Sequence, residues 1–159
     1  MGYQWLVSAV LGSAVIAGCD SGTGMMMGGQ ALPLNYNSNG ERIYFTGIST
    51  SGEAIGFSGG NMHSRMMDGG CATCHRADRS GGRMMPEFWK LAPPLTRDAL
   101  FEGHANGDDH GDHGSYDDVT LRRAVMEGTD PAGRRLDSVM PQWSMSERDW
   151  RDLLDYLKS

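Results

Sequence analysis

The stretch Cys71-Ala72-Thr73-Cys74-His75 contains two of the three cysteines of the chain, and the interpretation of the fold starts from it. In a helical turn, residues at i and i+3 share one face, so both thiols point to the same side with His75 next to them. This C-x-x-C-H spacing is the pattern of covalent c-type haem attachment, in which thiols bind the haem and histidine binds its iron. The motif therefore predicts one covalent haem c, held by Cys71, Cys74 and His75.

Two other uses of paired cysteines fit the sequence less well. A zinc site needs a second pair of ligands at similar spacing, and the remaining cysteine, Cys19, lies far from the motif. A thioredoxin-like dithiol needs a βαβ context, which the glycine-rich flanks of the motif do not supply. Haem attachment also leaves no cysteine over for a disulfide, because Cys19 belongs to an export segment.

Length and composition set the size of the surrounding domain. The chain has 159 residues, of which 39% are hydrophobic and 23 are glycine, so it forms one small domain and not a large two-domain enzyme. The formal net charge of -6 argues against a general nucleic-acid binder, which needs a basic surface to displace counterions from phosphates. The glycines indicate long loops, and so small a core needs a filler such as a haem.

The N-terminus has the composition of an export segment that is not part of the fold. Residues 5–17 are apolar or small, and the first charged residue is Asp20. The end of this segment, Ile16-Ala17-Gly18-Cys19, resembles a bacterial lipobox, in which the cysteine carries the lipid. We expect a lipoprotein signal peptide over residues 1–18 and lipidation of Cys19, which anchors the protein on the periplasmic side of the membrane. An uncleaved membrane anchor is the alternative, since a signal peptide normally begins with positive charge.

The mature chain divides into a tether and a domain. Residues 19–35 are rich in glycine and methionine and cannot bury a core, so they are expected to be a flexible tether. The folded domain is expected over residues 36–159. Because thioethers are soft ligands for Cu(I) and imidazoles also bind copper, the cluster Met25 to Met27 and the histidines of the chain leave a Met/His copper-binding lipoprotein as one alternative function.

Three segments of the domain have helical patterns. A short helix is expected over residues 39–45 with Asn39 as its cap, and a second over residues 117–127, ended by Gly128. The third begins at the capping residue Ser146, and its apolar face consists of Trp150, Leu153, Leu154 and Leu157. Residues 47–60 are expected to form a loop or small hairpin. The predicted fold class is all-α, with long Gly/Pro-rich loops.

Residues 36–159 resemble a class I cytochrome c. The resemblance rests on the haem motif, on the glycine and aromatic residues of the first helix, on a Pro-Leu pair after the motif, and on a Met-Pro segment before the last helix. The residues are Gly40, Tyr44, Phe45, Pro94, Leu95 and Met140-Pro141-Gln142-Trp143. The resemblance implies a small helical domain wrapped around one haem, with the first and last helices crossing near Gly40 and Tyr156.

The same resemblance implies roles for individual residues. His75 is the proximal iron ligand and Met140 the distal one, while Trp143 covers the haem nearby. The carbonyl of Pro93 or Pro94 accepts the other ring proton of His75. Met140 is preferred to other methionines because the proline after it keeps it extended and out of a helix. The competing sixth ligands are Met145 and, for a bis-histidine haem, His63.

The implied function is one-electron transfer between redox proteins, without enzymatic activity of its own. The chain acts alone or as the cytochrome subunit of a larger oxidoreductase. The alternative is a haem-based gas or peroxide sensor, or a small haem enzyme, whose sixth ligand is labile.

Charge is distributed unevenly over the chain. Residues 98–118 contain seven acids and no Lys or Arg, together with His104, His110 and His113. This insert is either a divalent-metal or partner-docking loop or a solvated surface loop. Around the haem motif, five basic residues outnumber three acids, which favours acidic redox partners: Arg65, Arg76, Arg79, Arg83 and Lys90 against Asp68, Asp78 and Glu87.

Overall fold

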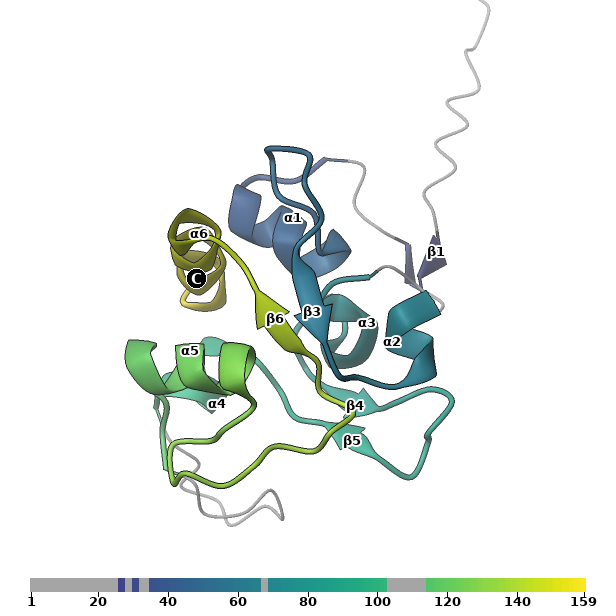
Figure 1. The fold of residues 1–159 in the computed structure, drawn as a ribbon, viewed down its shortest axis with the longest axis vertical. Helices are drawn as coiled ribbons and strands as arrows, with labels where there is room; N and C mark the ends of the chain where they lie inside the picture. The colour runs from purple at the N-terminus through teal and green to yellow at the C-terminus, as the bar shows by residue number, and fades with distance from the viewer. Residues whose placement is uncertain (1–25, 28–29, 32–34, 67–68, 103–113) are drawn as a thin grey trace, which may run out of the picture.

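The fold is known from a computed structural model, which describes residues 26–27, 30–31, 35–66, 69–102 and 114–159. The predicted signal peptide, Cys19, most of the tether and the centre of the acidic insert lie outside these residues. Helices and short strands follow one another along the described part of the chain (Figure 1). The helices are α1 (Asn39–Thr46), α2 (Met62–Met66), α3 (Ala72–His75), α4 (Arg97–Phe101), α5 (Asp118–Glu127) and α6 (Glu147–Leu157). The strands are β1 (Met26–Met27), β2 (Gln30–Ala31), β3 (Gly56–Ser58), β4 (Gly82–Arg83), β5 (Leu91–Ala92) and β6 (Gln142–Ser144).

The prediction of an all-α fold is wrong. The described residues form helices and also three antiparallel sheets of two strands each: β1 with β2, β3 with β6, and β4 with β5. Each strand has only two or three residues, too few to show the apolar and polar alternation that predicts a strand. The expected hairpin within residues 47–60 is present as the bridge between Ile48 and Ala54. The strand that follows this bridge pairs instead with the distant β6, through Phe57 opposite Trp143.

The first and last helices cross at Gly40, as expected. A Cβ atom on this residue would lie 1.8 Å from the backbone oxygen of Asp152 and 2.9 Å from the Cβ of Tyr156. Only glycine allows so close an approach. Tyr44 and Leu153, on the facing sides of α1 and α6, are 0% and 1% exposed, so this crossing forms the most tightly buried part of the core.

The ends of the long helices follow the sequence pattern, with one correction at α1. Ser146 caps α6 by accepting a hydrogen bond from the backbone of Asp149, and α5 ends at Gly128 in the left-handed conformation. The cap of α1 is Ser38 and not Asn39, because the Ser38 hydroxyl accepts the backbone N–H of Glu41 at 3.0 Å.

Asn39 instead joins α1 to α6 through the carboxylate of Asp149. Asp149 accepts hydrogen bonds from the side chains of Asn39 at 3.0 Å, Ser49 at 2.7 Å and Ser146 at 2.7 Å. Burial alone would raise the pKa of Asp149, but these hydrogen bonds to its charged form outweigh burial and hold the pKa below its ordinary value. The carboxylate therefore stabilises the crossing in its ionised form.

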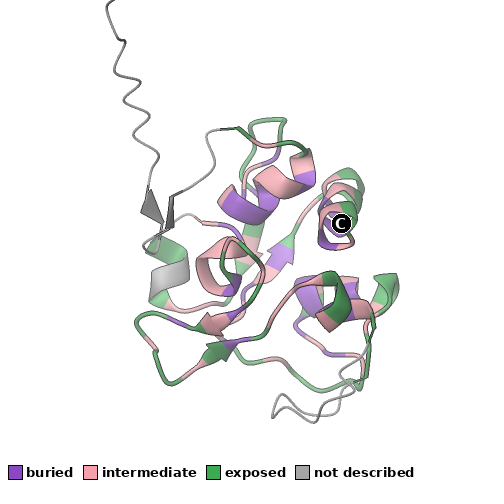
Figure 2. Cartoon of the chain, turned by 180° about the vertical axis from the view of Figure 1, so that it is seen from behind, coloured by how far each residue is buried: buried purple, intermediate pink, exposed green. Residues whose placement is uncertain are grey.

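The buried residues lie on the inner sides of the helices. In Figure 2 the buried segments of α1, α5 and β6 face the interior of the molecule. The apolar core contains residues from these three elements, from α4 and α6, and from the segment before β3. They are Ile43, Tyr44, Phe45, Ile55, Leu100, Leu121, Val125, Trp143, Trp150, Leu153, Leu154 and Leu157. Several of these side chains also form the walls of the cavity described next.

Candidate functional site

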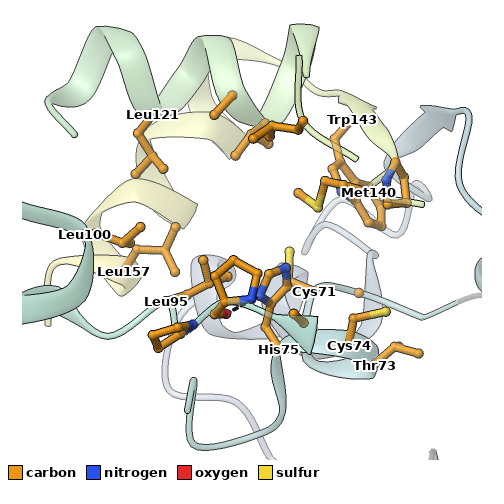
Figure 3. Close-up of a pocket in the computed structure, with 18 of the residues that line it drawn as sticks. Cys71, Thr73, Cys74, His75, Leu95, Leu100, Leu121, Met140, Trp143 and Leu157 are labelled. Atoms are coloured by element: carbon orange, nitrogen blue, oxygen red, sulfur yellow. Dashed lines mark hydrogen bonds between the residues drawn. The ribbon is translucent and has the colours of Figure 1, made fainter. Parts of the chain in front are cut away.

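A large cavity lies between α3, α5, the β4–β5 hairpin and the loop that leads into β6 (Figure 3). Its empty volume, which includes the open space at its mouth, is about 1320 Å³. Most of its walls are aliphatic: Leu95, Ala99, Leu100, Leu121, Ala124, Val125, Leu136, Val139, Leu153 and Leu157. These walls fit a large, mainly apolar group.

Both cysteines of the C-x-x-C-H motif border this cavity. The predicted helical turn is α3, in which the backbone N–H of His75 donates to the carbonyl of Cys71 at 2.9 Å. Cys71 and Cys74 are free cysteines one turn apart on the cavity wall. Burial raises the pKa of the Cys71 thiol to about 12 and also raises that of Cys74. Both are therefore neutral thiols at pH 7, in position to bind a group in the cavity.

His75 lies at the end of α3 with only 5% of its surface exposed. Its Nδ1 donates a hydrogen bond to the carbonyl oxygen of Pro93 at 2.8 Å, because a carbonyl can only accept. Nε2 then keeps its lone pair on the cavity side (Figure 3). Burial lowers the pKa of His75, in opposition to the Pro93 hydrogen bond, which raises it, so the imidazole is neutral and can bind a metal. The structure thus selects Pro93 as the partner, and Pro94 contributes only to the lining.

The local sequence holds this histidine and its partner in place. The helical turn ends after His75 because Arg76 has a left-handed φ of 65°, and the Tyr44 hydroxyl donates to the Arg76 carbonyl at 2.7 Å. Gly81 packs directly against the backbone of Ala92 and Pro93, since a Cβ on Gly81 would lie 2.3 Å from the carbonyl oxygen of Ala92. That contact fixes the backbone that carries Pro93.

Met140 reaches the cavity from the wall opposite His75 (Figure 3). Its backbone N–H donates to the carbonyl of Asp137 at 2.9 Å, so it lies in a turn and not in a helix. Met145 packs against the core instead and is not among the residues that line the cavity. A second methionine, Met84 in the β4–β5 hairpin, is buried and does line it. The sequence contains many methionines near the motif and offered no reason to single out Met84.

Trp143 supplies a polar atom that tests the fit of a haem. Its side chain is 6% exposed and lines the cavity, and its ring packs against Phe57 at 5.2 Å between centroids. The indole Nε1 is buried and has no hydrogen-bond acceptor among the described residues. A buried N–H of this kind is normally paired, and a haem carries carboxylate groups that could accept it. The thiols, the oriented imidazole, the thioether and the apolar walls all fit the same group.

Several predicted residues lie outside the part of the chain that the structure describes. These are Cys19, Met25, the histidines His104, His110 and His113, and the side chain of His63. Within the described ranges, no group of three or more His, Cys, Asp or Glu side chains is arranged to hold a metal ion. None of the helices in those ranges is long and apolar enough to cross a membrane.

No protein-family model, curated protein or solved structure matches the chain. Its function must therefore be argued from the chemistry of the cavity.

Proposed function

We propose that the protein is an exported, membrane-tethered electron carrier with one covalently attached haem c. The observation that carries this proposal is the arrangement of Cys71, Cys74 and His75 on one wall of a large apolar cavity, with Met140 on the opposite wall. When bound, the haem supplies an iron that changes its valence by one electron. The protein itself supplies attachment, orientation and exclusion of water.

Each side chain has a distinct role in this proposal. Cys71 and Cys74 would hold the porphyrin through thioether bonds. His75 would bind the iron through Nε2, and the carbonyl of Pro93, 2.8 Å from Nδ1, keeps its ring in one tautomer and one orientation. Met140 would supply the second protein ligand of the iron, and a thioether ligand raises the reduction potential relative to two nitrogen ligands.

The ligand set argues for a carrier rather than an enzyme. His75 and Met140 would together leave no ligand position on the iron for a substrate. The buried Nε1 of Trp143 would donate to a carboxylate of the haem, and the aliphatic walls keep water from the iron and so affect its potential. Redox proteins would be the partners, with Cys19 lipidated on the periplasmic side of the membrane.

Carbon monoxide separates this function from a gas sensor or a small haem enzyme. We expect the absorption spectrum of the reduced protein to stay unchanged when carbon monoxide is added at neutral pH, because Met140 occupies the sixth position. The Met140→Ala variant is the matched control, since it opens this position and should change its spectrum on the same addition. A shift in the wild type equal to that of Met140→Ala would favour the sensor.

A further inference from the structure

Exposed apolar side chains lie on α2 and on the β4–β5 hairpin, which also forms part of the cavity wall. Phe88 and Trp89 at the end of the hairpin are 60% and 64% exposed. Contiguous exposed apolar groups mark interaction surfaces, whereas scattered ones need no explanation. We call this surface the hairpin patch, and it consists of Met62, Met66, Met85, Phe88, Trp89 and Leu91.

The hairpin patch is a structured surface. The rings of Phe88 and Trp89 meet edge to face with centroids 5.2 Å apart. The turn below them is closed by the hydrogen bond from the backbone of Lys90 to the carbonyl of Glu87, at 2.8 Å. The side chain of Asn61, just before α2, donates to the Glu87 carboxylate at 3.2 Å. This contact joins α2 to the hairpin, and both lie at the same side of the molecule in Figure 1.

Basic side chains border the apolar groups. Arg65 in α2 donates to the carbonyl of Gly59 at 3.2 Å, and Arg83 in β4 donates to the carbonyl of Phe88 at 3.0 Å. Each of these contacts uses one of the three guanidinium nitrogens. Lys90 pairs with Asp137 at 2.9 Å, and Glu87 is the one acid of the hairpin end. Among the described residues, Arg65, Arg83 and Lys90 face Glu87 and Asp137, which leaves a surplus of one positive charge in a chain whose formal net charge is -6.

We propose that the hairpin patch docks on the anionic surface of the membrane to which the chain is tethered. Apolar and aromatic side chains bordered by Arg and Lys are the composition of surfaces that lie in the membrane interface. The inference rests on the membrane tether of the proposed function and not on its haem. The N-terminal strands β1 and β2, which follow the expected anchor, lie on the same side of the molecule as the patch (Figure 1).

The tether makes even a weak patch effective. The expected anchor at Cys19 is only seven residues before the start of β1 at Met26, and a stretch of this length reaches about 25 Å at most. Tethering at this distance gives an effective concentration in the range of ~1 mM. A surface whose affinity for lipid is too weak to hold a free protein would therefore be docked for much of the time.

Docking would also orient the cavity. Met84 and Leu91 belong to the same hairpin and line the cavity, and Leu91 is half exposed, so it lies at the mouth. A docked hairpin would hold this mouth close to the membrane. Electron exchange would then be directed to partners embedded in or bound to the same membrane.

The test uses the full chain, reconstituted in vesicles of phosphatidylcholine alone or of phosphatidylcholine with phosphatidylglycerol. Its anchor keeps the protein on both kinds of vesicle, which flotation verifies. Brief treatment with chloramine-T oxidises accessible methionines, and peptide mass spectrometry gives the rates at Met62, Met66 and Met85. A Val119→Met background supplies a reference, because Val119 is 73% exposed on α5, away from the patch.

We expect the three patch methionines to oxidise at least about threefold more slowly on the anionic vesicles, which is the protection given by a patch that is docked about two thirds of the time. The reference methionine at position 119 should oxidise at the same rate on both kinds of vesicle. High salt should remove the protection because it screens the arginines, and so should the double variant Phe88→Ser and Trp89→Ser.

Equal rates on both vesicles would overturn the proposal and are the result expected of a protein-docking surface. Protection that survives the double variant, or a chain that does not float with the vesicles, would overturn it as well. The haem absorbance of the same samples is read separately. If the methionines are protected but the protein carries no haem, the result contradicts the proposed electron carrier and not the docking. If the protein carries haem but its methionines are unprotected, the result contradicts the docking and not the electron carrier.

Discussion

Gly40→Ala should weaken the crossing of α1 and α6. Helix α1 also supports the C-x-x-C-H segment, because Tyr44 donates to the Arg76 carbonyl directly after it. An added Cβ would lie 1.8 Å from the Asp152 carbonyl oxygen and 2.5 Å from its carbon. Both are backbone atoms, so no side-chain rotation relieves the overlap and the helices must separate. Overpacking of this kind costs ~1–3 kcal/mol or more, and the better helix propensity of alanine returns at most ~1 kcal/mol. We expect a net loss of about 2 kcal/mol, measured by urea unfolding at equal haem content.

That loss corresponds to a fall in melting temperature of about 5–15 °C for a domain of this size. Gly56→Ala is the matched control, because a Cβ there would meet only Ser144, at 3.8 Å or more. We expect the control to remain within about 0.5 kcal/mol of the wild type, as surface substitutions usually do. The reasoning is refuted if Gly40→Ala is as stable as the wild type, or if both variants lose the same stability.

Three further predictions concern the crossing, the iron ligand and the anchor. Hydrogen bonds hold the pKa of Asp149 below its ordinary value. The stability that its ionised carboxylate gives to the fold is therefore fully present above pH ~4 and is lost as the pH falls further. Asp149→Asn should therefore be about 1–2 kcal/mol less stable at pH 7, with a smaller acid dependence in urea titrations. Met140→Ala should abolish the weak near-infrared band of a sulfur-ligated ferric haem, whereas Met145→Ala keeps it; the opposite result would move the ligand. Intact mass of membrane-extracted protein should show a chain that starts at Cys19 with added acyl groups, while Cys19→Ser stays a precursor, and a wild-type mass that includes residues 1–18 contradicts lipidation.

Local sequence patterns predicted α1, α5, α6 and the turn α3, but not the five-residue helices α2 and α4. Ser146 caps α6 through the backbone N–H of Asp149, and Gly128 ends α5 through a backbone bond to Ala124. Both partners lie within four residues in the sequence, so a local pattern is enough to predict the interaction. The one error of this kind concerned Ser38 and Asn39, which are both good capping residues. Which of them caps α1 depends on α6, because Asp149 and Asp152 accept the amide of Asn39.

The sheets and part of the site could not be predicted, because they depend on tertiary contacts. β3 and β6 are far apart in the sequence and pair with each other only in the folded chain, and Gly56–Ser58 has no strand pattern of its own. Pro93 and Pro94 are equivalent in sequence, and the hydrogen bond to His75 distinguishes them only in the fold. Met84 likewise lines the cavity because the β4–β5 hairpin folds back on α3.

Covalent attachment of haem to Cys71 and Cys74 is the central claim, and acidified organic solvent tests it most directly. This solvent extracts haem that is held by its ligands alone, so haem absorbance is measured in the protein pellet and in the solvent, together with the intact mass of the denatured chain. We predict that the haem stays with the protein and that the mass is that of the chain with one haem. Cys74→Ser should retain the haem through one thioether or lose it. Complete extraction of haem from the wild type, or a mass without haem after expression with an intact haem-attachment pathway, would contradict the account.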